Sequence, residues 1–109
     1  MHEENSAQGR IALPGVLVDL GNGQIDFEDG RQGRLREREL KLFQFLVLNR
    51  ERIIPRSEIL AKVWGLEGKV LTRTVDMHVS FLRKKLHLGH SLRAVRALGY
   101  IFQPQPAGA

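Results

Sequence analysis

The chain has 109 residues, which is enough for one domain with a buried core that needs no cross-links. It contains no cysteine, which excludes disulfides and cysteine-based metal sites, and no apolar run approaches the roughly 18 residues of a membrane span. We therefore expect a soluble protein, and the polar start Met-His-Glu-Glu-Asn-Ser does not resemble a signal peptide. The 17 basic and 12 acidic residues give a net charge of +5.

The charges are separated along the chain. Residues 1–29 carry a net charge of −5, whereas residues 72–96 carry a net charge of +5. A basic segment of this kind favours binding to a polyanion.

The N-terminal third predicts a small antiparallel sheet. Residues 1–10 are polar and aperiodic, so we expect a disordered tail or the remnant of a linker. From 11 to 35 apolar and polar residues alternate, and the turn-forming residues at 21–23 and 29–30 divide this stretch into strands. The expected result is a meander of three or four strands, the last at about 33–35.

Two helices are predicted next, at 37–49 and 57–64, because apolar side chains recur at intervals of three and four in both stretches. The residues expected to face inward are Leu40, Phe43, Leu46, Val47, Ile59, Leu60 and Val63. Between the helices, 53–54 is interpreted as a short apolar extension that Pro55 stops, and Gly65 ends the second helix.

A third helix is predicted from about 72 to 88, with Thr72 as its N-cap. Its buried stripe is expected to consist of Val75, Val79, Leu82 and Leu86. The opposite face combines cations with small polar and apolar side chains, namely Arg73, Met77, Ser80, Phe81 and Lys84. This composition suits a DNA major groove, although an ordinary solvated amphipathic helix would share it.

The chain closes with a predicted hairpin, whose strands at 92–95 and 100–103 flank a turn at 97–99. Residues 104–109 are expected to be disordered because of their composition. Three helices followed by a two-stranded hairpin predict an α+β winged helix-turn-helix domain at 11–103.

Six segments resemble, in order and spacing, the effector domain of OmpR/PhoB-type bacterial response regulators over about 16–102. The segments are LREREL (35–40), RSEIL (56–60), VWG (63–65), RTVDMHV (73–79), LRKKL (82–86) and VRALGY (95–100). The resemblance implies sequence-specific binding of double-stranded DNA in transcription, in the bacterial cytoplasm. The third helix would enter the major groove, and the hairpin wing would lie at the minor groove. It also implies an upstream receiver domain, controlled by phosphorylation, in the full-length protein.

The resemblance also implies roles for individual residues. Phosphate contacts would come from Arg56, Trp64, Arg73, His78, Arg83, Lys84 and Tyr100. Met77, Ser80 and Phe81 would face bases, and Arg96 would enter the minor groove. Candidate contacts to RNA polymerase are Leu66, Glu67 and Lys69. Family members commonly sit head to tail on DNA, and we expect the isolated domain to be a monomer.

Each of these roles has a plainer alternative. Trp64 suits a core anchor, Arg96 an exposed strand residue, and Phe81 a side chain leaning on Trp64 or Met77. Asp76 is expected to orient Arg73 or Arg56 instead of acting as a base.

Four residues depart from the pattern of the family. Arg36 and Pro55 replace capping residues, each typically worth about 1 kcal/mol. Ala94 replaces a threonine that often touches phosphate, and Ala97 replaces the usual glycine of the wing turn.

Other functions are less well supported by the residues. No catalytic constellation can be assembled, so we expect neither an enzyme nor a cofactor. His87 and His90 are too few for a metal site and more typical of a solvated pair. A protein-interaction or RNA-binding module using the same basic face remains the alternative to DNA binding.

Overall fold

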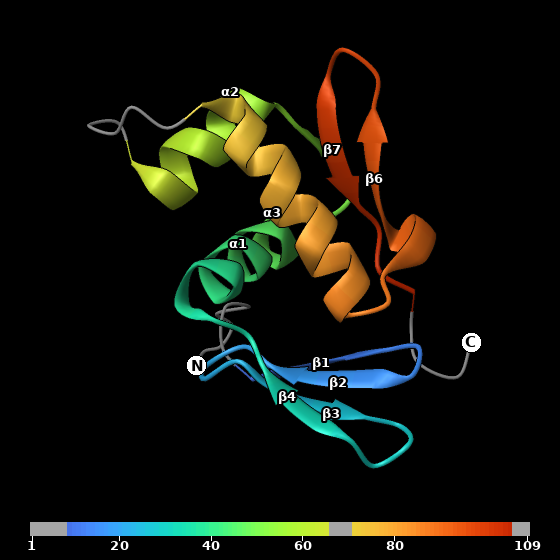
Figure 1. Ribbon diagram of the computed structural model, residues 1–109. Helices are drawn as coiled ribbons and strands as arrows, with labels where there is room; N and C mark the ends of the chain where they lie inside the picture. The colour runs from blue at the N-terminus through green and yellow to red at the C-terminus, as the bar shows by residue number, and fades with distance from the viewer. Residues whose placement is uncertain (1–8, 66–70, 106–109) are drawn as a thin grey trace.

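The computed structural model describes residues 9–65 and 71–105 (Figure 1). The expected tails were 1–10 and 104–109; residues 1–8 and 106–109 lie outside the described residues, whereas Arg10 is the first residue of a strand and not part of a tail. The elements are β1 (Arg10–Leu13), β2 (Val16–Asp19), β3 (Gln24–Phe27), β4 (Gln32–Arg34), α1 (Glu37–Leu48), β5 (Ile53–Ile54), α2 (Arg56–Ile59), η1 (Leu60–Trp64), α3 (Thr72–Lys85), η2 (Gly89–Ser91), β6 (Leu92–Val95) and β7 (Gly99–Phe102). This order confirms the α+β fold predicted from the sequence.

The first four strands form an antiparallel sheet in the order β1-β2-β3-β4. Figure 1 shows this sheet beneath the helices, with the β6–β7 hairpin at the other side of the molecule. Val16, Val18 and Ile25 are buried because alternate residues of each strand face the helices. The last strand ends at Arg34, one residue earlier than expected, and Leu35 instead enters the core.

Helix α1 begins without a side-chain cap, as predicted from the arginine at position 36, where the family pattern has a capping residue. A guanidinium has no acceptor atom, so Arg36 cannot bind the free N–H groups of the first turn. Half of a capping box survives, because the Glu39 carboxylate accepts a 2.8 Å hydrogen bond from the Arg36 backbone N–H. The helix buries Leu42 along with the expected Phe43, Leu46 and Val47, whereas Leu40 is only partly buried.

The segment between α1 and α2 differs from the prediction. Ile53–Ile54 forms the short strand β5, which pairs antiparallel with β7, so it is more than an apolar extension. Helix α2 begins at Arg56, one residue early, with uncapped Pro55 before it. It continues through a turn of π-helix, η1, and ends at Gly65, whose φ of 91° suits a residue without a Cβ.

The ends of α3 correct two expectations. Leu71 occupies the N-cap position and Thr72 is the first helical residue, so the proposed threonine cap was wrong. The helix ends at Lys85, because His87 adopts a φ of 54° that a helix cannot continue. The predicted stripe of Val75, Val79, Leu82 and Leu86 is buried.

The wing is the β6–β7 hairpin, and β7 lies at the centre of a second sheet in the order β5-β7-β6. Its turn contains Ala97 with a φ of 66°, so alanine adopts the conformation expected of the usual glycine. Phe102 of β7 packs edge-to-face on Phe43 of α1, with ring centroids 5.7 Å apart. One apolar core therefore joins the wing to the helices. None of the helices in the described segments is long and apolar enough to cross a membrane.

Candidate nucleic-acid interface

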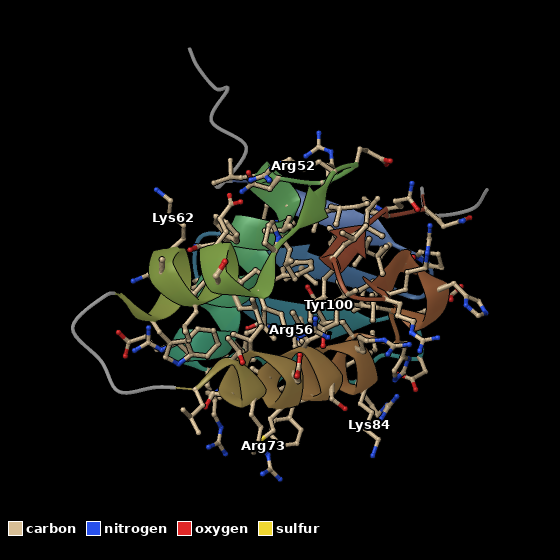
Figure 2. All side chains as sticks on the ribbon, turned by 90° about the horizontal axis from the view of Figure 1, so that it is seen from above. Arg52, Arg56, Lys62, Arg73, Lys84 and Tyr100 are labelled. Atoms are coloured by element: carbon tan, nitrogen blue, oxygen red, sulfur yellow. The ribbon has the colours of Figure 1, made fainter. Side chains whose placement is uncertain are left out.

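Helix α3 presents one face outward from the body of the domain. Figure 2 shows α3 along one side, with Arg73 and Lys84 directed away from the other elements. Between them, Met77 and Phe81 are 47% and 52% exposed, although both are large apolar side chains. Phe81 is thus outside the core, as its angle from the buried stripe predicted. The face mixes cations, apolar groups and the hydroxyl of Ser80, which is the combination that phosphates and base edges can use.

On the wing side of α3, Asp76 holds residues from two other elements. Its Oδ1 accepts a 2.7 Å hydrogen bond from Nε of Arg56 at the start of α2. The same oxygen accepts a 2.6 Å hydrogen bond from the hydroxyl of Tyr100 in β7. The Arg56 guanidinium lies 5.0 Å from the centroid of the Tyr100 ring, close enough for a cation–π contact. The expectation that Asp76 orients an arginine is confirmed, and the arginine is Arg56.

The ionisation of this cluster follows from its contacts. Burial tends to raise the pKa of Asp76, but hydrogen bonds from Tyr100 and Arg56, with the charge of Arg56, outweigh it and lower the pKa. Burial and the neighbouring carboxylate raise the pKa of the Tyr100 phenol. Tyr100 is only 6% exposed and its proton is donated to Asp76, so in this arrangement it positions Arg56 and offers no hydrogen to a ligand.

The side of α3 that faces α1 carries a row of rings. The His78 ring lies edge-to-face on Trp64, with centroids 5.0 Å apart, and 6.3 Å from the ring of Phe81. Trp64 is half-buried against the core, and the guanidinium of Arg38 lies 5.6 Å from its centroid. The ring neighbour of Phe81 is therefore His78, whereas the plainer alternative from the sequence placed it on Trp64 or Met77.

His78 is oriented by its own helix. Its Nδ1 lies 2.9 Å from the carbonyl oxygen of Thr74, and a carbonyl can only accept, so Nδ1 must carry the hydrogen. In a neutral ring Nε2 is then an acceptor. Donation from Nε2 to a phosphate would therefore require the protonated ring.

The remaining predicted residues fall into two groups. Arg83 and Arg96 are exposed, Arg83 near the end of α3 and Arg96 in the wing turn just after β6. The Arg83 Nη2 donates a 3.3 Å hydrogen bond to the carbonyl of Gly89, which holds it beside the wing. Leu66, Glu67 and Lys69 lie outside the described residues.

Sequence reasoning missed two parts of this surface. Arg38 was assigned no role, although its Nη1 donates to the carbonyl of Val63 beside Trp64. The pairing of Lys85 Nζ with Glu39 Oε1, at 2.8 Å, also went unforeseen. Both contacts join α1 to residues far along the chain, and no spacing within either segment could have revealed them.

Comparison with known proteins identifies the family. Residues 30–102 match the family described as "Transcriptional regulatory protein, C terminal". The chain is 38% identical over 103 residues to the phosphate regulon transcriptional regulatory protein PhoB of Rhizobium meliloti, covering 84% of this chain and 45% of that protein. It is 30% identical over 105 residues to the transcriptional regulatory protein TrcR of Mycobacterium tuberculosis, covering 94% of this chain and 40% of that protein.

A solved structure agrees with these relatives. The Klebsiella pneumoniae RstA DNA-binding domain, determined in complex with the RstA box, superposes with a TM-score of 0.72 at 25% identity, covering 90% of this chain and all of that one. The chain spans less than half the length of these two curated relatives. The description of the family, a regulator of transcription, confirms the expectation that the domain is not an enzyme. The chain belongs to the family of C-terminal domains of transcriptional regulatory proteins.

Proposed function

We propose that this domain binds a specific sequence of double-stranded DNA and thereby regulates transcription. Helix α3 would lie in the major groove, and the β6–β7 wing would lie at the adjoining minor groove. The single observation that carries the proposal is the outer face of α3, where exposed Met77 and Phe81 lie among Arg73 and Lys84 on a helix firmly anchored by its opposite side. The similar RstA DNA-binding domain, solved in complex with the RstA box, supports the proposal that this domain binds DNA.

The roles of the residues follow from where their side chains lie. Arg73, Lys84 and Arg83 are exposed cations suited to phosphates. Arg56 would contact a phosphate while Asp76 and Tyr100 hold its guanidinium. Met77, Ser80 and Phe81 would face base edges, because they lie along the outer face between these cations. Trp64 and His78 would contact the backbone from the α1 side, and Arg96 would enter the minor groove.

In the full-length protein we propose a phosphorylated receiver domain upstream, in the bacterial cytoplasm. The support is that the curated relatives are longer than this chain and the family is one of regulators. We further propose that Leu66, Glu67 and Lys69 contact RNA polymerase. On DNA, two domains would sit head to tail on a direct repeat of about 10–10.5 bp, while the free domain stays a monomer. Sedimentation with and without a selected duplex tests this assembly, and a stable dimer without DNA would contradict it.

Selection of bound duplexes from a random library tests the central proposal and supplies the site. Affinity for the selected duplex should fall steeply with salt, because each neutralised phosphate contributes about −0.9 to the slope of log K against log salt. Arg83→Ala should weaken all duplexes alike, since a phosphate contact reads no base. A flat salt response or the absence of any selected sequence would refute DNA binding.

An RNA-binding or protein-binding module using the same face is the alternative. Recognition of single-stranded RNA usually stacks bases on several exposed aromatic rings of a sheet. In the described residues, the exposed aromatic ring beside the cations is Phe81, which lies on a helix. Competition by an RNA of the selected sequence, or a partner protein bound without salt dependence, would favour the alternative.

A further inference from the structure

The surface beside α3 is hollowed on the side that faces the start of α1. The hollow has a volume of about 410 Å³ and is lined by Arg36, Arg38, Glu39, His78, Phe81 and Lys85. His78 and Phe81 belong both to this hollow and to the ring row beside the outer face of α3. The hollow is therefore continuous with the surface that would meet DNA.

The lining of the hollow is positively charged. Glu39 is its one acidic residue, and its carboxylate accepts hydrogen bonds of 2.8 Å from Lys85 Nζ and from the Arg36 backbone N–H. Lys85 thus neutralises Glu39, and the guanidinium groups of Arg36 and Arg38 add two positive charges. Arg38 is held by its bond to the Val63 carbonyl and its position over Trp64, and a guanidinium with five N–H donors keeps others for a ligand.

The position of the hollow identifies its ligand. When a helix enters a major groove, the two sugar-phosphate strands run along its two flanks. Arg56 and Arg83 lie on the wing side of α3. On the opposite side, the described cations beside the outer face are those of the hollow. We propose that Arg36 and Arg38 bind phosphates of the DNA strand that runs along the α1 side of α3.

This inference rests on the proposed DNA binding and deepens it by adding a backbone contact from α1. It also gives a role to Arg36, which stands where the family pattern has a capping residue. Arg36 forfeits a side-chain cap, yet it places a cation at the rim of the hollow. An arginine at position 36 therefore makes α1 less stable than a capping residue would, but it adds a positive charge to the proposed binding surface.

The slope of log Kd against log KCl concentration tests the proposal, measured with the duplex that the wild-type domain selects. Arg36→Gln should make the slope shallower by about 0.9 for the lost phosphate, and Arg38→Gln should do the same. Lys62→Gln removes the same charge from a side chain that Figure 2 shows directed away from α3, and it should leave the slope unchanged. Arg36 uses only its backbone in the fold contacts above, so its variant keeps the test independent of folding.

Neutral methylphosphonate linkages, placed one at a time along each strand, give a second measurement. Wild type should lose affinity at one or two linkages on the α1 side, and Arg36→Gln should be insensitive to at least one of them. Slopes equal to wild type, or equal loss in the Lys62 control, would overturn the proposal while leaving DNA binding intact. Failure of the wild type to bind any duplex would instead refute the proposed function, and this contact with it.

Discussion

The hydroxyl of Tyr100 donates a 2.6 Å hydrogen bond to Asp76, which joins the wing to helix α3. Because Arg56 binds the same oxygen, a single carboxylate sets the position of a cation from α2 and a strand from the wing. Asp76 therefore positions both groups. Its removal should weaken DNA binding, although the loss of a negative charge would by itself strengthen binding to DNA.

Asp76→Asn should weaken binding to the selected duplex about tenfold, or about 1.4 kcal/mol, because Arg56 loses its fixed orientation. The change removes a negative charge near the DNA, which by electrostatics alone would strengthen binding. Glu28→Gln, in the exposed turn that follows β3, alters the net charge equally and should not weaken binding. Fluorescence anisotropy measures both, and tighter binding by the Asp76 variant would contradict the positioning role.

Stability should depend on pH through the same carboxylate. The folded pKa of Asp76 lies below its ordinary value of 3.8, so its stabilising contribution is present above that value and is lost as pH falls through the folded pKa. The difference in unfolding free energy between wild type and Asp76→Asn should be constant above about pH 5 and shrink below about pH 4. Urea titrations across this range measure it. A difference that grows at low pH would reverse the assigned sign.

Gly99→Ala should destabilise the wing severely. Gly99 has a φ of 140°, and a Cβ there would lie 2.0 Å from the backbone carbonyl oxygen of Ile54. Backbone atoms cannot retreat as a flexible side chain can, so we expect a loss of about 3 kcal/mol or more in unfolding free energy. Thermal and urea denaturation provide the measurement.

A matched control lies two residues earlier in the same turn. Ala97→Gly removes the strain of an alanine with a positive φ and should stabilise the domain by about 0.5–1 kcal/mol. A decrease in unfolding free energy for Gly99→Ala together with an increase for Ala97→Gly would confirm the geometry of the turn. If Gly99→Ala were tolerated, β5 and β7 would not be in close contact.

Arg96→Ala should reduce binding most on sites with an A-tract beneath the wing. A narrow A·T-rich minor groove concentrates negative potential and attracts an inserted arginine. The exposed position of Arg96, directly after β6, suits such an insertion. Duplexes that differ only in A·T or G·C flanks provide the comparison. Equal losses on both would reduce Arg96 to an ordinary exposed cation.

Phe81 and Met77 should read the methyl groups of thymine, because neither can make the bidentate guanine contact of an arginine. Replacing thymines beneath α3 by uracil removes the methyl and keeps base pairing. Wild type should lose on the order of 1 kcal/mol per critical methyl, and Phe81→Ala should be nearly indifferent to the exchange. Identical responses would show that Phe81 only shapes the surface, for example through its contact with His78.

The parts of this fold that depend on local patterns could be predicted from the sequence. The buried stripe of α3 and the exposure of Phe81 follow from helical periodicity alone. The order of sheet, helices and hairpin follows from the spacing of turns and apolar residues. The family pattern added the functional interpretation of the basic face.

The rest depends on contacts between distant segments. Two residues are too few to show the periodicity of a strand, so the identity of Ile53–Ile54 as β5 depends on pairing with β7. The expected threonine cap failed because α3 starts one residue earlier, with a 2.8 Å bond from the Thr74 N–H to the Leu71 carbonyl. The sequence offered both Arg73 and Arg56 as partners of Asp76. The hydrogen bond from Arg56 depends on how distant segments fold together, so the sequence alone could not choose between them.

Strand β5 has a consequence for how the domain opens. Ile54 pairs with Tyr100, and the next two residues begin α2, so the base of the wing and the start of α2 share one stretch of backbone. Hydrogen bonds that are linked in this way break together in native-state hydrogen exchange. The amides of β7 and of the first turn of α2 should therefore exchange with one common opening free energy, while the wing turn at Ala97 exchanges faster. The wing at the minor groove and the proposed phosphate contact of Arg56 would then belong to one cooperative unit, in which opening at either end also opens the other.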